Sequence, residues 1–221
     1  MTTITRRPLR VRAAVVLGTT FSLAATGVLG GTAISRVAGD KMAPWIIGRA
    51  SGVCAYLLLV ALVLLGLVLS HPARARLGGS TPARIRLHIA LALFTFVFTA
   101  LHVVVLATDR FAGVGWWGTL LPMRATYRPA AVTLGLIGMW TGLLAGLTAG
   151  LAGHLPRRAW WPLHKVAAVS LVLIWLHGVL AGGDTPALLG IYVATGLLVL
   201  GLGASRYVAG RATAVARRSR S

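Results

Sequence analysis

Acidic residues are almost absent from this 221-residue chain, which has three of them against 22 lysines and arginines. Cysteine is rarer still: Cys54 stands alone, so one chain can form neither a disulfide nor a cysteine-based metal cluster. No G-x-G-x-x-G pattern occurs in a strand-to-helix setting, and no stretch remains for a soluble domain that would bind a nicotinamide or flavin nucleotide. Any catalytic domain that works with this chain is therefore expected to be a separate protein.

Long apolar runs make up most of the chain, and 57% of its residues are hydrophobic. A helix needs about 20 apolar residues to cross the hydrocarbon core of a membrane. The predicted spans are 13–35, 45–70, 86–108, 130–152, 160–181 and 186–208. We read 13–35 as a retained helix rather than a cleaved signal, because it is long and no convincing A-x-A site follows. The predicted fold is all-α, an integral membrane six-helix bundle at 13–208 between a basic segment at 1–12 and a basic tail at 209–221.

Fifteen of the 22 basic residues fall on one predicted face of the membrane. They precede the first span, follow the last, and occupy the loops after the second and fourth spans: Arg6, Arg7, Arg10, Arg12, Arg74, Arg76, Arg84, Arg86, Arg157, Arg158, Arg206, Arg211, Arg217, Arg218 and Arg220. The three acidic residues, Asp40, Asp109 and Asp184, fall in the loops on the opposite face. The positive-inside rule then places both termini in the cytoplasm of a multi-pass cell-membrane protein. This sorting explains the net charge of +19 without nucleic acid, and anionic lipid is an alternative partner for the tails.

Four histidines stand inside two of the apolar runs. His88 and His102 are fourteen positions apart in the third span, and His164 and His177 are thirteen apart in the fifth. Ionisable residues within a membrane span are rare and indicate a function, because hydrocarbon does not replace their hydrogen bonds to water. His102 lies seven positions before Asp109 and His177 seven before Asp184, so these two share a depth near the outer face. His88 and His164 share a depth near the cytoplasmic face, which predicts the pairs His88 with His164 and His102 with His177.

Two imidazoles on either side of one iron leave it six-coordinate and low-spin, suited to electron transfer and closed to substrate. The paired depths therefore predict two b-type haems, with His88, His102, His164 and His177 as axial ligands. The second nitrogen of each ring is expected to be bound by a backbone carbonyl or a hydroxyl, and Thr99 is a possible contributor at His102. At about 100° per residue, fourteen positions return to one helix face, whereas thirteen leave His177 roughly 140° from His164. We expect a π-type bulge, or a kink near Gly178, to supply the missing rotation.

Several other polar and small residues each have two possible roles. Arg49 is a candidate partner for the propionates of the outer haem, or an arginine that extends to the interface. Lys165 either neutralises an inner propionate or is an ordinary interfacial lysine. A four-residue glycine repeat in the fourth span indicates close helix packing, and a porphyrin-binding groove is the alternative; its members are Gly138, Gly142, Gly146 and Gly150. His71 and His154 lie outside the paired pattern and are not expected to be ligands.

The histidine spacing resembles that of the ferric reductase-like transmembrane family, which includes NADPH oxidases and metalloreductases. The resemblance covers most of the chain and extends to the second span, from Trp45-Ile-Ile-Gly48-Arg49-Ala-Ser-Gly52 through Ala55-Tyr56-Leu57-Leu58-Leu59 to Leu65-Gly66. It implies six helices, inner haem ligands at His88 and His164, outer ligands at His102 and His177, and electrons that move outwards from the cytoplasm.

The chain departs from the large oxidases of this family because no flavin and nicotinamide domain follows the last span. In this it is similar to stand-alone bacterial members, among them the haem-bearing membrane subunit of a periplasmic methionine sulfoxide reductase. The resemblance implies a component of an oxidoreductase, with a cytoplasmic flavoprotein or a membrane quinol as donor and ferric iron, oxygen or a partner reductase as extracytoplasmic acceptor. A flavin or quinone would then come from a partner.

Two other functions stay open on the sequence. A quinol-oxidising cytochrome b subunit shows similar paired histidines on two helices. A small permease or assembly subunit would instead use the histidines to relay protons or bind a metal ion. The predicted spans contain no Asp or Glu, which weakens the proton-relay alternative.

Overall fold

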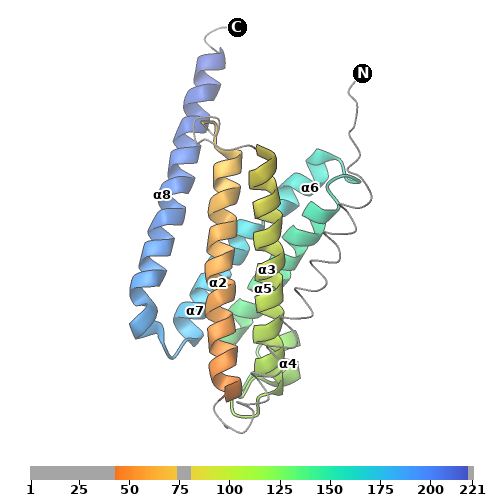
Figure 1. Ribbon diagram of the computed structural model, residues 1–221, viewed down its shortest axis with the longest axis vertical. Helices are drawn as coiled ribbons and strands as arrows, with labels where there is room; N and C mark the ends of the chain where they lie inside the picture. Colours follow the sequence, from red (N-terminus) through yellow and green to blue (C-terminus); the bar gives the residue numbers. More distant parts are fainter. Residues whose placement is uncertain (1–42, 74–80, 219–221) are drawn as a thin grey trace, which may run out of the picture. The chain divides into compact units, whose positions relative to one another are not determined.

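The computed structural model describes residues 43–73 and 81–218 (Figure 1). The predicted span 13–35 and the N-terminal segment 1–12 lie outside the described residues. The packing described below is that of the unit Trp45–Ser221. All regular structure in the described part is helical, in agreement with the predicted class.

Seven helices are described, and their order along the chain is α2 (Ala43–Ser70), α3 (Thr81–Thr108), α4 (Gly115–Leu120), α5 (Pro129–Gly150), α6 (Arg157–His164), α7 (Ala167–Ala181) and α8 (Thr185–Arg218). Five stretches of the described chain are long and apolar enough to span a membrane: α2, α3, α5, α6 together with α7, and α8. They correspond to the second to sixth predicted spans. Many large apolar side chains on them are exposed, such as Leu93 at 62% and Leu200 at 71%. Lipid chains, rather than water, are the natural neighbours of such surfaces.

The structure adds three features to the predicted spans. The last helix does not end at 208 but continues to Arg218, because alanine and arginine are strong helix formers and no proline interrupts the segment. The predicted span 160–181 is two helices, since α6 ends at His164 and α7 begins at Ala167. The loop between the third and fourth spans contains α4, a short helix that the apolar pattern did not predict.

Helices α5 and α7 make the most extensive contact between elements. An added Cβ at Gly138 would lie 2.8 Å from Ile174 Cδ1, and one at Gly142 would lie 3.0 Å from Ser170 Oγ, so the glycines permit this close approach. Gly146 is likewise covered, but by Phe96 of α3. The packing role predicted for the glycine repeat is thus confirmed at three of its positions, whereas a Cβ added at Gly150 would lie within 4 Å of no described side chain or neighbouring helix.

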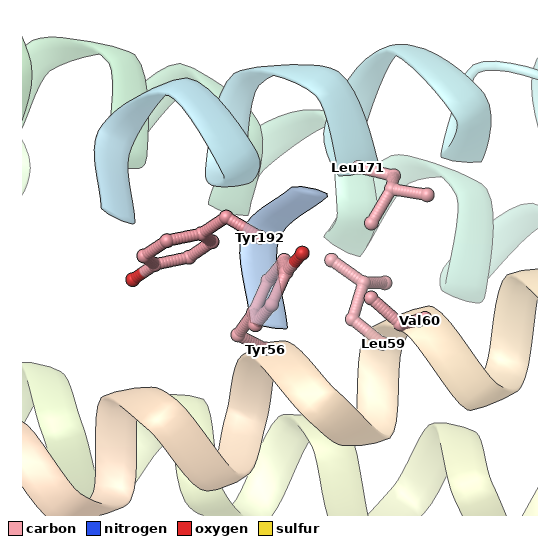
Figure 2. Packing of buried hydrophobic residues seen from close by; sticks show 5 residues of the cluster. All are labelled: Tyr56, Leu59, Val60, Leu171 and Tyr192. Carbon is pink, nitrogen blue, oxygen red and sulfur yellow. The ribbon is translucent and has the colours of Figure 1, made fainter. Parts of the chain in front are cut away.

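A second contact joins α2, α7 and α8. Its buried side chains form one cluster, made of Tyr56, Leu59, Val60, Leu171 and Tyr192. Figure 2 shows these five side chains meeting between the helices. The hydroxyl of Tyr56 is hydrogen-bonded to Thr195, and the indole of Trp175 donates to the Tyr192 carbonyl oxygen at 3.1 Å. These polar atoms are therefore satisfied by neighbouring helices.

Ser170→Ala is expected to destabilise the α5–α7 contact. The Ser170 hydroxyl is buried and donates to the Gly138 carbonyl oxygen at 2.7 Å, a bond between helices that alanine cannot make. Hydrogen bonds of this kind contribute about 1 kcal/mol in membrane proteins, so thermal unfolding in detergent should show a lower midpoint. Thr141→Ala is the matched control, because the Thr141 hydroxyl bonds only to carbonyls of its own helix. Equal losses in the two variants would contradict this role of Ser170.

Candidate functional site: two histidine pairs in one cavity

A cavity of about 940 Å³ extends through the bundle and is lined by all four predicted histidines. Its volume lies near the top of the roughly 300–1,000 Å³ range of cofactor and small-molecule sites. At one end, called the acidic end here, it reaches Trp45, Arg49 and Asp184. At the other, called the basic end, it reaches Lys165 and Arg206. Most of the lining between the ends is apolar.

At the acidic end His102 of α3 faces His177 of α7. Their ring centres are 6.3 Å apart and the ring planes make an angle of 78°. The Nδ1–H of His102 donates to the Gly48 carbonyl oxygen at 2.6 Å, and that of His177 donates to the Ala131 carbonyl oxygen at 2.8 Å. Because carbonyls only accept, each ring keeps its proton on Nδ1 and leaves Nε2 with a free lone pair.

At the basic end His88 of α3 faces His164, the last residue of α6. Their ring centres are 6.2 Å apart and the planes make an angle of 71°. The Nδ1–H of His164 donates to the Ala145 carbonyl oxygen at 3.3 Å. The Nδ1 of His88 is buried without a hydrogen-bond partner among the described residues, and its neighbouring backbone acceptor is Leu62. The structure therefore brings the four histidines together in the two pairs that depth matching predicted, with tighter hydrogen bonds at the acidic end.

The residues that contact the four imidazole rings recur at an interval of fourteen residues. The sequence alone did not lead us to this pattern. The backbone groups facing Nδ1 belong to Gly48 and Leu62 on α2 and to Ala131 and Ala145 on α5. Three of the rings also lie against glycines. A Cβ added at Gly52 would lie 2.7 Å from the His102 ring, and one added at Gly135 would lie 2.7 Å from the His177 ring. A Cβ added at Gly66 would lie 3.4 Å from the His88 ring. Fourteen residues complete nearly four turns, so each repeat stays on one helix face. The spacing of Gly52 and Gly66, equal to that of His88 and His102, is the signal that would have found them.

The thirteen-residue interval between His164 and His177 is accommodated directly after His164. The N–H of Val166 donates to Leu163 and that of Ala168 to Lys165, both at 3.1 Å, which are the bonds of a tightened turn. Such a turn advances about 20° more per residue than an α-helix and so moves His177 toward the face of His164. The expected π-type bulge is wrong, because the turn after His164 is tighter than an α-helical turn rather than wider. Helix α7 continues through Gly178 without interruption, and a kink there stays a prediction.

The ring separations fit a metal between the two imidazoles of each pair. An imidazole nitrogen lies about 1 Å from its ring centre and about 2 Å from a metal that it ligates, so opposite ligands have ring centres about 6 Å apart. Both observed separations agree with this value. The described residues contain no group of three or more histidine, cysteine, aspartate or glutamate side chains that would hold a bare ion. Two neutral imidazoles in an apolar cavity instead match a metal whose other ligands come from an organic ring, as in haem.

Arg49 lies at the acidic mouth of the cavity and forms an ion pair with Asp184. Its guanidinium also lies 5.3 Å from the Trp45 ring centre. The structure thus gives Arg49 a partner that sequence reasoning did not assign. Asp184 directly precedes α8, so the pair joins the beginning of that helix to α2 beside the His102–His177 site.

Other predicted contributors are placed as follows. Thr99 lines the cavity, but the Nδ1 of His102 is bound by the Gly48 carbonyl, so the partner is the backbone carbonyl of the two expected alternatives and not the Thr99 hydroxyl. The Lys165 amine lies 5.6 Å from the Trp161 ring centre at the basic mouth. His71 lies outside the cavity lining, and its Nε2 is hydrogen-bonded to Ser205 at 3.2 Å. His154 also lies outside that lining.

Comparison with known proteins yields no match: no family model, no curated protein and no solved structure corresponds to the chain. The geometry of the two histidine pairs is therefore the main indication of function.

Proposed function

We propose that this protein carries electrons across a membrane through two b-type haems, one held by His88 and His164 and the other by His102 and His177. The observation that carries the proposal is the meeting of two imidazole pairs across helices, each with ring centres just over 6 Å apart, in one apolar cavity. When bound, six-coordinate haems supply reversible one-electron chemistry at two depths of the membrane.

The protein's own residues hold and orient the imidazoles. Backbone carbonyls of α2 and α5 keep the proton on Nδ1, which would leave Nε2 to ligate a haem iron and would raise the basicity of Nε2. The carbonyls of Gly48 and Ala131 do this most closely, at 2.6 and 2.8 Å. Because the acceptors are backbone atoms within helices, the rings are fixed by the helix packing itself.

The positions of the pairs suit transfer from one membrane face to the other. The fourteen residues between His88 and His102 on α3 correspond to about 20 Å along the helix axis. By the positive-inside rule the basic end faces the cytoplasm, which places the His88–His164 pair on the donor side. The proposed donor is a cytoplasmic flavoprotein or a membrane quinol, and the proposed acceptor is extracytoplasmic ferric iron, oxygen or a partner reductase.

The test begins with purification in detergent from haem-replete cells. We expect about two non-covalent haems per chain and a dithionite-reduced minus oxidised spectrum of b-type haem. Vesicles that contain the protein and enclose ferricyanide should then pass electrons from external dithionite to the enclosed ferricyanide. Vesicles with His102→Ala provide the control. Colourless protein, or ferricyanide reduction that does not differ from the control, would refute the proposal.

The donor is identified by a second comparison with the same purified protein. A flavin reductase with NADPH and a reduced short-chain quinol are supplied separately, and haem reduction is followed optically. Fast reduction by quinol alone, blocked by a quinone-site inhibitor, would assign the protein to the quinol-oxidising cytochromes. Reduction that requires the flavin reductase would assign a protein donor.

A further inference from the structure

The two histidine pairs differ in how firmly their Nδ1 protons are bound. At the acidic end both imidazoles donate to carbonyls, at 2.6 and 2.8 Å. At the basic end His164 donates at 3.3 Å, and the buried Nδ1 of His88 faces the Leu62 backbone but makes no close hydrogen bond in the described part of the chain. A strong bond from Nδ1 makes an imidazole a more basic ligand. Basic ligands stabilise ferric iron, so the acidic-end pair favours the lower reduction potential.

The net charge at the two ends of the cavity also favours a higher reduction potential at the basic end. Four charged side chains line it. Arg49 and Asp184, at the acidic end, form an ion pair and nearly cancel. Lys165 and Arg206, at the basic end, are both cations, and Arg206 is held there by a 2.7 Å bond from its Nε to Ser70 Oγ. A net positive charge favours the reduced iron, which carries one positive charge less, and raises the potential of the nearby site.

We infer that the haem between His88 and His164 has the higher reduction potential and accepts the first electron, and that Lys165 and Arg206 set this order. The inference rests on the proposed function. Hydrogen bonding and local charge are independent features of the structure, and both favour the same order. Each haem iron takes one electron from the reductant, so full reduction of one chain consumes two.

The order is tested by potentiometric titration of the purified haem-loaded protein, with dithionite as reductant and optical detection. Two separate one-electron waves are expected. The variant His88→Ala should lack the wave at higher potential, and His177→Ala should lack the wave at lower potential. Loss of the opposite waves, or two waves that coincide in the wild type, would overturn the inference.

The charge contribution is tested in the same titration. Lys165→Gln and Arg206→Gln should each shift the upper wave to lower potential and move the lower wave less. Lys165→Arg, which keeps the charge, should restore the wild-type position. Arg211→Gln, on an exposed part of α8 away from the cavity lining, is the matched control and should shift neither wave. An upper wave that stays in place in both glutamine variants would refute the assigned role of the two cations.

The acidic end allows the complementary experiment. Asp184→Asn leaves the charge of Arg49 unpaired and should raise the lower wave toward the upper one. Adding Arg49→Gln removes that charge and should return the lower wave toward its original potential. A lower wave that does not move in Asp184→Asn would contradict the charge argument. Absence of haem from the wild-type protein would instead refute the proposed function, so the two failures are distinguishable.

Discussion

Replacing one of the four cavity histidines by alanine is expected to remove one haem and to leave the other. His88→Ala and His164→Ala should remove the same haem, because their rings face each other 6.2 Å apart. His102→Ala and His177→Ala should remove the second, whose ligand rings are 6.3 Å apart. Haem content is measured as the pyridine haemochrome relative to protein and should fall by about half, since an iron bound by one imidazole loses a ligand that fixes it in the cavity.

Double variants test directly which two histidines bind the same haem. His88→Ala combined with His164→Ala should retain one haem, whereas His88→Ala combined with His102→Ala, both on α3, should retain none. His71→Ala and His154→Ala are the controls and should keep both haems, because neither residue lines the cavity. A double variant that keeps one haem after losing both α3 histidines would show that the ligand pairs are assigned incorrectly.

Gly52→Ala and Gly135→Ala are expected to weaken or abolish haem binding at the acidic end, although neither glycine is a ligand. A Cβ at Gly52 would lie 2.7 Å from the His102 ring, and one at Gly135 would lie 2.7–2.9 Å from three atoms of the His177 ring. These rings cannot retreat freely, because their Nδ1–H groups are bound to carbonyls. A displaced imidazole would no longer meet iron at the required distance. The measurement is haem content, with the low-spin optical spectrum as a second readout.

The chain offers two matched controls for these substitutions. Gly66→Ala should be tolerated, because its Cβ would lie 3.4 Å from the His88 ring, an ordinary contact. Gly150→Ala should also be tolerated, because nothing lies within 4 Å of the added carbon. Equal haem loss in all four alanine variants would point to general destabilisation of the helices and would contradict the seating role of Gly52 and Gly135.

Much of the fold followed from hydropathy alone. The described helices match the second to sixth predicted spans because each must satisfy its own backbone hydrogen bonds in lipid, which makes long apolar runs easy to recognise. Prediction failed where local packing or propensity decided the outcome. The narrowed turn after His164 and the extension of α8 to Arg218 produce no change in hydropathy that marks their position.

The site was partly predictable for a similar reason. Depth in a membrane is proportional to position along a helix, so the distances of His102 and His177 from Asp109 and Asp184 were enough to pair them. The partners of Nδ1 were not predictable in the same way, because a backbone carbonyl is present at every residue. Thr99 was a plausible side-chain partner by proximity in sequence, but Gly48 of the neighbouring helix is the one that binds His102.

By itself, the sequence determined that this is a helical membrane protein with two pairs of histidines at two depths, because hydropathy and rise per residue are properties of each helix alone. Only the tertiary structure decided that the pairs face each other just over 6 Å apart, that glycines and carbonyls of α2 and α5 seat them, and that Arg49 is paired with Asp184. These features depend on the rotation and contact of one helix against another. Side chains distant along the chain create them jointly, so no single segment encodes them.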